Sequence, residues 1–315
     1  MNVGGIFMEK IWAYLIHLGF NMWLDWEHPN YKNSDSVSTD SLRCEKEVWD
    51  KLVEEMPKYG INMVVIDLGE GVRYRSHPEI AIEGAWEVET LKEELKKMRD
   101  MGLEPIPKLN FSTTHDNWLG KYSRCVSTEE YYRVCRDLIN EVIDIFEGPR
   151  FFHLGMDEET YEHQRNMLYV VIRQYDLWWN DFLFLVNEVE RNSSRAWIWS
   201  DHLWRHKEDF FKKMPKTVVQ SNWYYGKEFS SDLAYVRAYL ELAEAGYDQI
   251  PTGSNWSYEE NFLLTVEFCG KNIPDEHLLG FLQTSWRPTT RKWLDTHIKA
   301  LELMKKGIEV YKGIS

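Results

Sequence analysis

The sequence contains few cysteines and no excess of positive charge. Its four cysteines are scattered along 315 residues, with neither a CxxC pair nor the spacing of a zinc site. We expect a cytoplasmic protein, since a reduced interior suits this cysteine usage as well as any compartment does. The formal net charge is −14, so the chain lacks the basic face that nucleic acid or an anionic membrane surface would require of a partner.

Long apolar runs, repeats and long linkers are absent as well. No stretch is long and apolar enough to span a bilayer. The segment from Ile11 to Trp23 resembles the core of a signal peptide, but His17 and Asn21 interrupt it and no small-residue cleavage site is visible. We therefore interpret this segment as a first strand, and we expect one domain over residues 1–315.

Tryptophan, in contrast, is abundant, with 15 residues in the chain. Indole rings fill protein cores, and they also stack on the apolar faces of sugar rings. We expect core packing to explain more than half of them. The tryptophans that lie near the ends of expected strands are the ones that bear on function.

Short apolar runs alternate with amphipathic segments along the whole chain. This pattern favours a parallel sheet whose strands are joined by right-handed helical crossovers. Eight such strands, closed on themselves, form an α/β fold of the (β/α)8 TIM barrel type. The expected strands are 11–20, 61–67, 103–110, 150–154, 196–200, 217–221, 249–252 and 279–285, and the expected helices are 45–58, 88–101, 127–146, 177–190, 207–213, 232–245 and 290–311.

The fourth expected strand ends in the most distinctive stretch of the sequence. Its apolar run stops at Gly155, and Asp157 and Glu158 follow almost at once. The C-terminal ends of the strands form the active-site mouth of an α/β barrel. Successive side chains of a strand point to opposite faces, so the two acids can share one site only where the strand breaks into a loop. Gly155 favours such a break.

Polar and aromatic side chains follow seven of the eight expected strands. A single acid in such a place is more often a helix cap, and a single histidine or tryptophan is more often a core residue. The recurrence at so many strand ends instead favours a cleft for a polyhydroxylated ring. The residues concerned are Asp67 and Arg73, Asn110 and His115, His153, Asp157 and Glu158, Trp199, Asp201 and His202, Trp223, Tyr224 and Tyr225, Trp256, Tyr258 and Glu259, and Trp286 and Arg287.

Residues 153–158, with the sequence His-Leu-Gly-Met-Asp-Glu, resemble the His-x-Gly-Gly-Asp-Glu signature of glycoside hydrolase family 20, the β-N-acetylhexosaminidases. Residues 62–80, which include Asp67 and Arg73, are similar to the second strand of that family and the loop after it. Residues 102–115 resemble its third strand. The similarity covers roughly residues 11–300, and the second glycine of the signature is Met156 here.

This resemblance implies a catalytic role for each of the two acids. Glu158 would protonate the glycosidic oxygen, and we expect its pKa to be raised by the neighbouring acid and the tryptophan-lined surroundings. Asp157 would orient the 2-acetamido group of the substrate, whose carbonyl oxygen attacks the anomeric carbon. Retention through the substrate's own acetamido group is an exception to the usual two-carboxylate scheme.

The resemblance also implies the substrate and the residues that bind it. The partner would be an oligosaccharide or glycoconjugate with a terminal β-linked amino sugar, GlcNAc or GalNAc, and no cofactor or metal is expected. The implied roles are Arg73 on the sugar hydroxyls, Tyr258 on the acetamido oxygen, Trp199, Trp223 and Trp286 around the N-acetyl group, and Asp67 with His115 or His153 in a supporting polar network.

The residues themselves leave two other enzyme classes open. A glycosidase of different sugar specificity would pair Glu158 with a more distant carboxylate, Asp201 or Glu259, as nucleophile or base. A metal-dependent isomerase or deacetylase would use Asp67, His115 and His153, although no adjacent pair of histidines supports it.

A barrel that binds carbohydrate without hydrolysing it is also open. After strand eight, Trp286 is followed by Arg287 and Pro288, where the family carries a glutamate that binds sugar hydroxyls. Loss of that glutamate would weaken the hold on the terminal sugar, or it would suit a different sugar.

Overall fold

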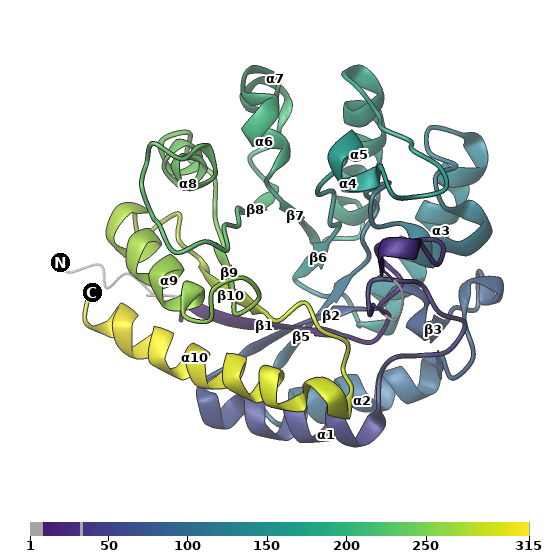
Figure 1. Cartoon of the computed structure of the whole chain (residues 1–315), viewed down its shortest axis with the longest axis horizontal. Coiled ribbons are helices and arrows are strands. Elements are labelled where there is room, and N and C mark those ends of the chain that lie inside the picture. Colours follow the sequence, from purple (N-terminus) through teal and green to yellow (C-terminus); the bar gives the residue numbers. More distant parts are fainter. Residues whose placement is uncertain (1–8, 32–33, 315) are drawn as a thin grey trace.

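The computed structural model describes residues 9–31 and 34–314, and its centre is a sheet of eight parallel strands in the order β8-β7-β6-β5-β2-β1-β10-β9. Bridges between Gln220 and Gln249, and between Trp223 and Thr252, join the segments around the two outermost strands and close the sheet into a barrel. Figure 1 shows the helices surrounding this barrel, with α10 beside α1 and next to β1. The expected (β/α)8 barrel is confirmed.

The barrel strands are β1 (Ile11–His17), β2 (Met63–Asp67), β5 (Glu104–Lys108), β6 (Phe151–His153), β7 (Arg195–Trp199), β8 (Val219–Ser221), β9 (Thr252–Ser254) and β10 (Gly280–Thr284). A separate small sheet pairs β3 (Val72–Arg73) with β4 (Trp86–Glu87). The helices are α1 (Lys46–Glu55), α2 (Val88–Asp100), α3 (Glu129–Ile145), α4 (Tyr161–Gln164), α5 (Asp176–Glu190), α6 (His202–Arg205), α7 (Lys207–Lys213), α8 (Ala234–Glu244), α9 (Asn261–Asn272) and α10 (Leu294–Lys312). Short 3-10 turns cover Pro29–Tyr31, Met56–Tyr59, Gly69–Gly71, Pro78–Ile80, Asn117–Tyr122 and Arg291–Trp293.

Each expected strand has a counterpart, although β9 begins where the expected strand 249–252 ends. Helix α9 is an addition, because no helix was expected between the last two strands. Its buried side chains include Phe262, Val266 and Cys269, which share one helical face, so a periodic signal was present in the sequence. No helix in the described part of the chain combines the length and the apolar character that a membrane crossing needs.

Side chains fill the inside of the barrel in layers, as alternate residues of each strand point inward. On β1 these are Ile11, Ala13 and Leu15, which belong to an apolar cluster with Val65 of β2 and Ile106 of β5. The intervening residues of each strand point outward and pack against the helices. The inward rows are therefore apolar until they reach the C-terminal ends of the strands.

The uppermost inward layer is polar. His17, Asp67, Lys108 and His153 are register neighbours on the adjacent strands β1, β2, β5 and β6, and all four are buried. Lys108 forms an ion pair with Asp67, and His17 Nδ1 lies 3.5 Å from Asp67 Oδ2. Burial alone would raise the pKa of Asp67, but the charge of Lys108 and the contact with His17 outweigh it and lower this pKa to about 2. The layer directly beneath the barrel mouth thus contains a charged pair, Asp67 and Lys108.

Replacing Lys108 with methionine is expected to lower the free energy of unfolding by about 3–5 kcal/mol, because it leaves the carboxylate of Asp67 buried without its partner. Chemical denaturation monitored by circular dichroism measures this change. The double replacement Lys108→Met with Asp67→Asn removes the uncompensated charge and should recover at least half of the loss. Equal stability of Lys108→Met and the wild type would show that the pair carries no such role.

Candidate active site

A cavity of about 460 Å³ opens among the loops that follow the C-terminal ends of the strands. It is lined by Asn110 and His115 after β5, Asp157 and Glu158 after β6, and by aromatic residues after β8 and β10. Further lining residues come from the loop after β1, from the segment around α4 and from the loop after β9. The cavity therefore lies at the end of the barrel that the sequence analysis indicated.

The chain leaves β6 through a loop in which three of four residues have left-handed backbone angles. The φ values are +71° at Gly155, +76° at Met156 and +58° at Glu158. A Cβ atom at Gly155 would lie 2.0 Å from Oδ1 of Asn110, so only glycine fits there. Met156 and Glu158 hold this conformation at a cost of about 1–3 kcal/mol each, which surrounding contacts must offset. The strand thus breaks into a loop before the acid pair, as expected.

Side chains that follow β5 hold this loop in place. Asn110 accepts a hydrogen bond from the Met156 N–H at 3.1 Å and donates one from Nδ2 to Oδ1 of Asp157 at 2.8 Å. Thr114 Oγ1 donates to the carbonyl of Glu158 at 2.7 Å. The position of Asp157 is therefore fixed through both its side chain and the backbone on either side of it.

Asp201, just after β7, holds the loop from the other side. Its Oδ2 accepts the backbone N–H of Glu158 at 2.8 Å. Burial, together with the charges of Asp157 and Glu158, raises the pKa of Asp201 to about 7. Asp201 does not line the cavity of about 460 Å³. Its geometry is that of a residue that positions Glu158.

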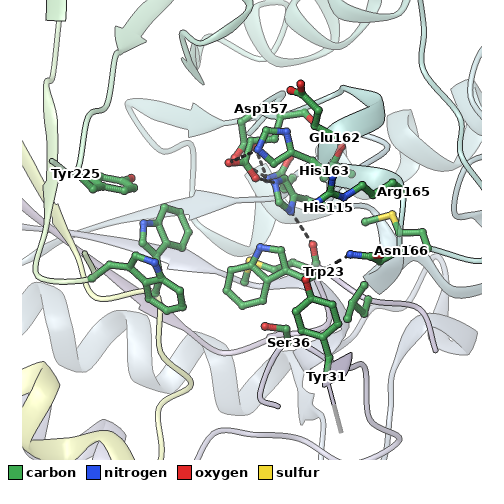
Figure 2. Close-up of a pocket in the computed structure, with 18 of the residues that line it drawn as sticks. Trp23, Tyr31, Ser36, His115, Asp157, Glu162, His163, Arg165, Asn166 and Tyr225 are labelled. Carbon is green, nitrogen blue, oxygen red and sulfur yellow. Dashed lines mark hydrogen bonds and ion pairs between the residues drawn. The ribbon is translucent and has the colours of Figure 1, made fainter. Parts of the chain in front are cut away.

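Both acids meet at one nitrogen of His115. Nε2 of His115 lies 3.3 Å from Oδ2 of Asp157 and 3.2 Å from Oε2 of Glu158. The other ring nitrogen, Nδ1, lies 2.7 Å from the carbonyl oxygen of Met22, which can only accept, so Nδ1 carries a proton. His163 reaches Oε1 of Glu158 at 3.3 Å from the opposite side. Figure 2 shows His115, Asp157 and His163 grouped on one side of the cavity, opposite Tyr225.

These contacts shift the pKa values of the residues in the site. Burial disfavours a charged imidazole, but Asp157 and Glu158 outweigh it and raise the pKa of His115 well above its ordinary value. Burial would likewise raise the pKa of Glu158, but His115 and His163 outweigh it and lower that pKa below its usual range. The expected raised pKa of Glu158 is therefore wrong, because the two histidines favour its ionised form.

The wall opposite the acids is aromatic. Trp223, Tyr225 and Trp286 line it. The hydroxyl of Tyr225 and the indole N–H of Trp286 are both buried, and the hydroxyl interacts with the side chains of Trp286 and Thr284. The two aromatic side chains thus form one connected wall.

Five of the ten residues predicted for the site line the cavity, namely Asp157, Glu158, His115, Trp223 and Trp286. Three others lie beneath it. Asp67 and His153 belong to the polar layer of the barrel, where the ring of His153 packs 5.0 Å from that of Trp197. Trp199 is 1% exposed and packs edge-on against Trp286 at 5.7 Å between ring centres. These three residues do not line the cavity.

The structure does not bring Arg73 and Tyr258 to the cavity, so their predicted roles in sugar binding need correction. A 3-10 turn after β2 leads the chain out of the barrel into β3, where Nε of Arg73 pairs with Glu87 at 3.1 Å and the side chain is 43% exposed. Tyr258 lies in the loop after β9, with its hydroxyl 3.5 Å from Oε2 of Glu260. Neither residue lines the cavity.

The structure also separates the residues that the two alternative enzyme classes would require. Glu259 pairs with Lys299 at 3.2 Å outside the cavity, and Asp201 serves the backbone of Glu158. Asp67 and His153 flank the buried ammonium of Lys108, which repels a cation. Among the described residues, the set that could hold a metal ion is His115, Asp157 and Glu158, whose ligand atoms all lie within 4.8 Å of one another.

Several residues that line the cavity were given no individual role in the site by the sequence analysis. Tyr225 follows β8 within the aromatic run 223–225, so the sequence signalled an aromatic site there without distinguishing its members. His163 and Arg165 lie in and after the short helix α4, five and seven residues beyond Glu158. Their proximity in sequence to the acid pair was the available signal.

Three solved structures show the same barrel. A chitobiase from Flavobacterium johnsoniae matches with a TM-score of 0.62 at 14% identity over 86% of this chain and 49% of its own. A β-N-acetylhexosaminidase from Bacteroides fragilis matches with 0.63 at 14% identity over 94% and 65%. A mutant Streptomyces plicatus β-hexosaminidase in complex with GlcNAc matches with 0.63 at 13% identity over 95% and 64%.

The similarity of this chain to these proteins lies in the backbone structure. No protein-family model and no curated protein sequence matches the chain. The chain spans between 49% and 65% of the length of these three solved chains. At 13–14% identity, what is shared is the backbone arrangement. The protein has the (β/α)8 barrel fold of the family 20 β-N-acetylhexosaminidases.

Proposed function

We propose that the protein is an exo-acting, retaining glycoside hydrolase of the β-N-acetylhexosaminidase type. Its substrates would carry a terminal β-linked GlcNAc or GalNAc. One observation carries this proposal: Asp157 and Glu158, adjacent in sequence, both reach Nε2 of His115 and line one cavity walled by Trp223 and Trp286. Two acids in one aromatic-walled cavity suit a sugar that carries its own nucleophile.

The chemistry proceeds in two steps. In the first, the acetamido carbonyl oxygen attacks the anomeric carbon while Glu158 gives a proton to the glycosidic oxygen, and the bond to the leaving group breaks. The resulting oxazolinium ion carries positive charge beside Asp157, whose carboxylate stabilises that charge as it develops. In the second step, Glu158 takes a proton from a water that attacks the anomeric carbon. The oxazolinium ring opens and the configuration is retained.

The site also supplies the proton and the hydrogen bonds that this chemistry needs. His115 holds a proton 3.2 Å from Oε2 of Glu158, within transfer distance of the acid. Tyr225, which lines the cavity where Tyr258 does not, donates its hydroxyl to the acetamido oxygen and orients that oxygen toward the anomeric carbon. Trp286 closes the same wall.

A panel of 4-nitrophenyl glycosides tests the proposal. We expect hydrolysis of the β-N-acetylglucosaminide or the β-N-acetylgalactosaminide, and a kcat/KM at least a thousandfold lower for the matching β-glucoside and β-galactoside, which lack the acetamido nucleophile. Comparable rates on sugars with and without the 2-acetamido group would contradict the proposal.

Asp201→Ala is expected to lower kcat roughly ten- to a hundredfold, since a small misplacement of a catalytic group has effects of this size. The variant loses the acceptor for the Glu158 N–H. The left-handed backbone conformation of Glu158 is then no longer held by this hydrogen bond. Asp201→Asn keeps an oxygen acceptor and should retain most of the activity. Steady-state kinetics on both variants, with KM compared separately, measures the effect, and a wild-type kcat for Asp201→Ala would show that Asp201 does not position the acid.

A further inference from the structure

Three side chains in the wall of the cavity present potential metal ligands to one another. They are His115, Asp157 and Glu158, whose ligand atoms all lie within 4.8 Å. Because Nδ1 of His115 donates to the carbonyl of Met22, the lone pair of Nε2 faces the two carboxylates (Figure 2). Three acceptor atoms that face one another are stabilised by a cation between them, and that cation can be a proton or a metal ion.

We propose that His115, Asp157 and Glu158 bind one zinc ion and that this ion switches the hydrolase off. The binding of zinc stands on the geometry of the three side chains alone. The inhibition rests on the proposed function, because it takes the two acids as the catalytic pair. A carboxylate that coordinates zinc cannot give a proton to the glycosidic oxygen, nor can it stabilise the oxazolinium ion. Zinc and the amino sugar would therefore exclude each other.

The separation of the ligand atoms suits a tetrahedral zinc ion. Zinc holds nitrogen and oxygen ligands at about 2.0–2.1 Å, so two neighbouring ligand atoms lie roughly 3.3–3.4 Å apart. Nε2 of His115 lies 3.3 Å from Oδ2 of Asp157 and 3.2 Å from Oε2 of Glu158. An imidazole among the ligands favours zinc over magnesium and calcium, which prefer oxygen ligands alone.

Each of the three ligands is held in place through its second polar atom. The holding contacts are Nδ1 of His115 with the carbonyl of Met22 at 2.7 Å, Oδ1 of Asp157 with Nδ2 of Asn110 at 2.8 Å, and Oε1 of Glu158 with Nε2 of His163 at 3.3 Å. Contacts of this kind orient metal ligands, and their loss typically lowers metal affinity by roughly ten- to a hundredfold. The ligand atoms are thus oriented before an ion binds.

The cavity gives an ion access to these atoms. The side chain of His115 is 4% exposed, whereas those of Asp157 and Glu158 are 11% and 23% exposed and face the cavity. The two carboxylates balance the charge of a divalent ion. With three protein ligands, the fourth position of a tetrahedral ion would face the cavity and take a water molecule.

Calorimetric titration of the EDTA-treated and dialysed protein tests the binding. We expect one zinc ion per chain from zinc chloride, with a Kd at least a hundredfold lower than that for magnesium chloride. His115→Gln and Glu158→Gln should each weaken zinc binding at least a hundredfold, because each loses a ligand. His163→Gln, which changes only a holding contact, should weaken it roughly tenfold or more.

His277→Gln is the matched control for these variants. His277 also contacts a carboxylate, with Nδ1 lying 3.3 Å from Asp248, but it does not line the cavity. This variant should bind zinc as the wild type does. Equal affinity for zinc in the wild type, His115→Gln and Glu158→Gln would mean an adventitious ion only, and it would overturn the inference.

The inhibition is tested on the 4-nitrophenyl N-acetylglucosaminide. Saturating zinc chloride should lower kcat/KM at least tenfold in the wild type and in His277→Gln, and EDTA should restore it. The thiazoline analogue of N-acetylglucosamine should weaken zinc binding at least tenfold, since both occupy the acid pair. Full activity of the zinc-bound enzyme would overturn the switch.

Failure of the proposed function gives a different result, namely no hydrolysis of any glycoside by the metal-free wild type. The calorimetric comparison of the wild type with His115→Gln and Glu158→Gln then still decides whether the three side chains bind zinc. Hydrolysis that requires zinc would overturn the inhibitory role of the ion.

Discussion

Replacement of Glu158 by glutamine is expected to lower kcat on N,N′-diacetylchitobiose by a factor of about 100 or more, the usual contribution of general acid catalysis. Glutamine keeps the shape of the side chain and its place between His115 and His163, but it has no acidic proton to give to the leaving oxygen. Steady-state kinetics at fixed pH measures the loss.

The choice of leaving group provides the control for this variant. A 2,4-dinitrophenolate departs without protonation, so the same variant should lose less than tenfold in kcat on the 2,4-dinitrophenyl N-acetylglucosaminide. An equal loss on both substrates would mean that Glu158→Gln disturbs the geometry of the loop and not the transfer of a proton.

Replacement of Asp157 by asparagine is expected to lower kcat by roughly 10²–10³, which is the typical effect of removing one group that stabilises charge in the transition state. In the proposed mechanism, the carboxylate of Asp157 faces the nitrogen of the acetamido group, where positive charge develops. Asn110 holds its other oxygen at 2.8 Å, so the charge is fixed in position before substrate arrives. Steady-state kinetics on both the nitrophenyl and the dinitrophenyl glycosides measures the effect.

This loss should not depend on the leaving group, in contrast to that of Glu158→Gln, because ring closure precedes or accompanies departure for every substrate. Circular dichroism should show an unchanged fold. A variant with wild-type kcat would remove Asp157 from the mechanism and would favour a glycosidase that uses no acetamido group.

The sequence predicted the barrel because its strands and helices have different periods of hydrophobicity. Most of the strands lie in a recognisable apolar run, although β9 has the sequence Thr-Gly-Ser, and the break at Gly155 predicted two acids at the mouth. The missed helix α9 also carried a helical pattern, in Phe262, Val266 and Cys269. The expectation of a single domain over residues 1–315 stays a prediction.

The details of the site depended on contacts between segments that lie far apart in the chain. Alternation along a strand shows that the side chains of Asp67 and His153 point into the barrel. It does not show whether they lie at the mouth of the barrel or in the layer beneath it. Tyr225 and Tyr258 both follow expected strands, and only the paths of their loops decide that Tyr225 lines the cavity and Tyr258 does not. The lowered pKa of Glu158 arises from His115 and His163, and the ring of His115 is held by the carbonyl of Met22, 93 residues away.

The most direct test of the acetamido mechanism is inhibition by a thiazoline analogue of N-acetylglucosamine, a stable mimic of the oxazolinium ion. If Asp157 and Glu158 share the cavity with the acetamido group, this compound should compete with substrate and bind at least a hundredfold more tightly than KM, as analogues of high-energy states do. It should also bind at least tenfold more weakly to Asp157→Asn. An active enzyme that the thiazoline does not inhibit would contradict the mechanism.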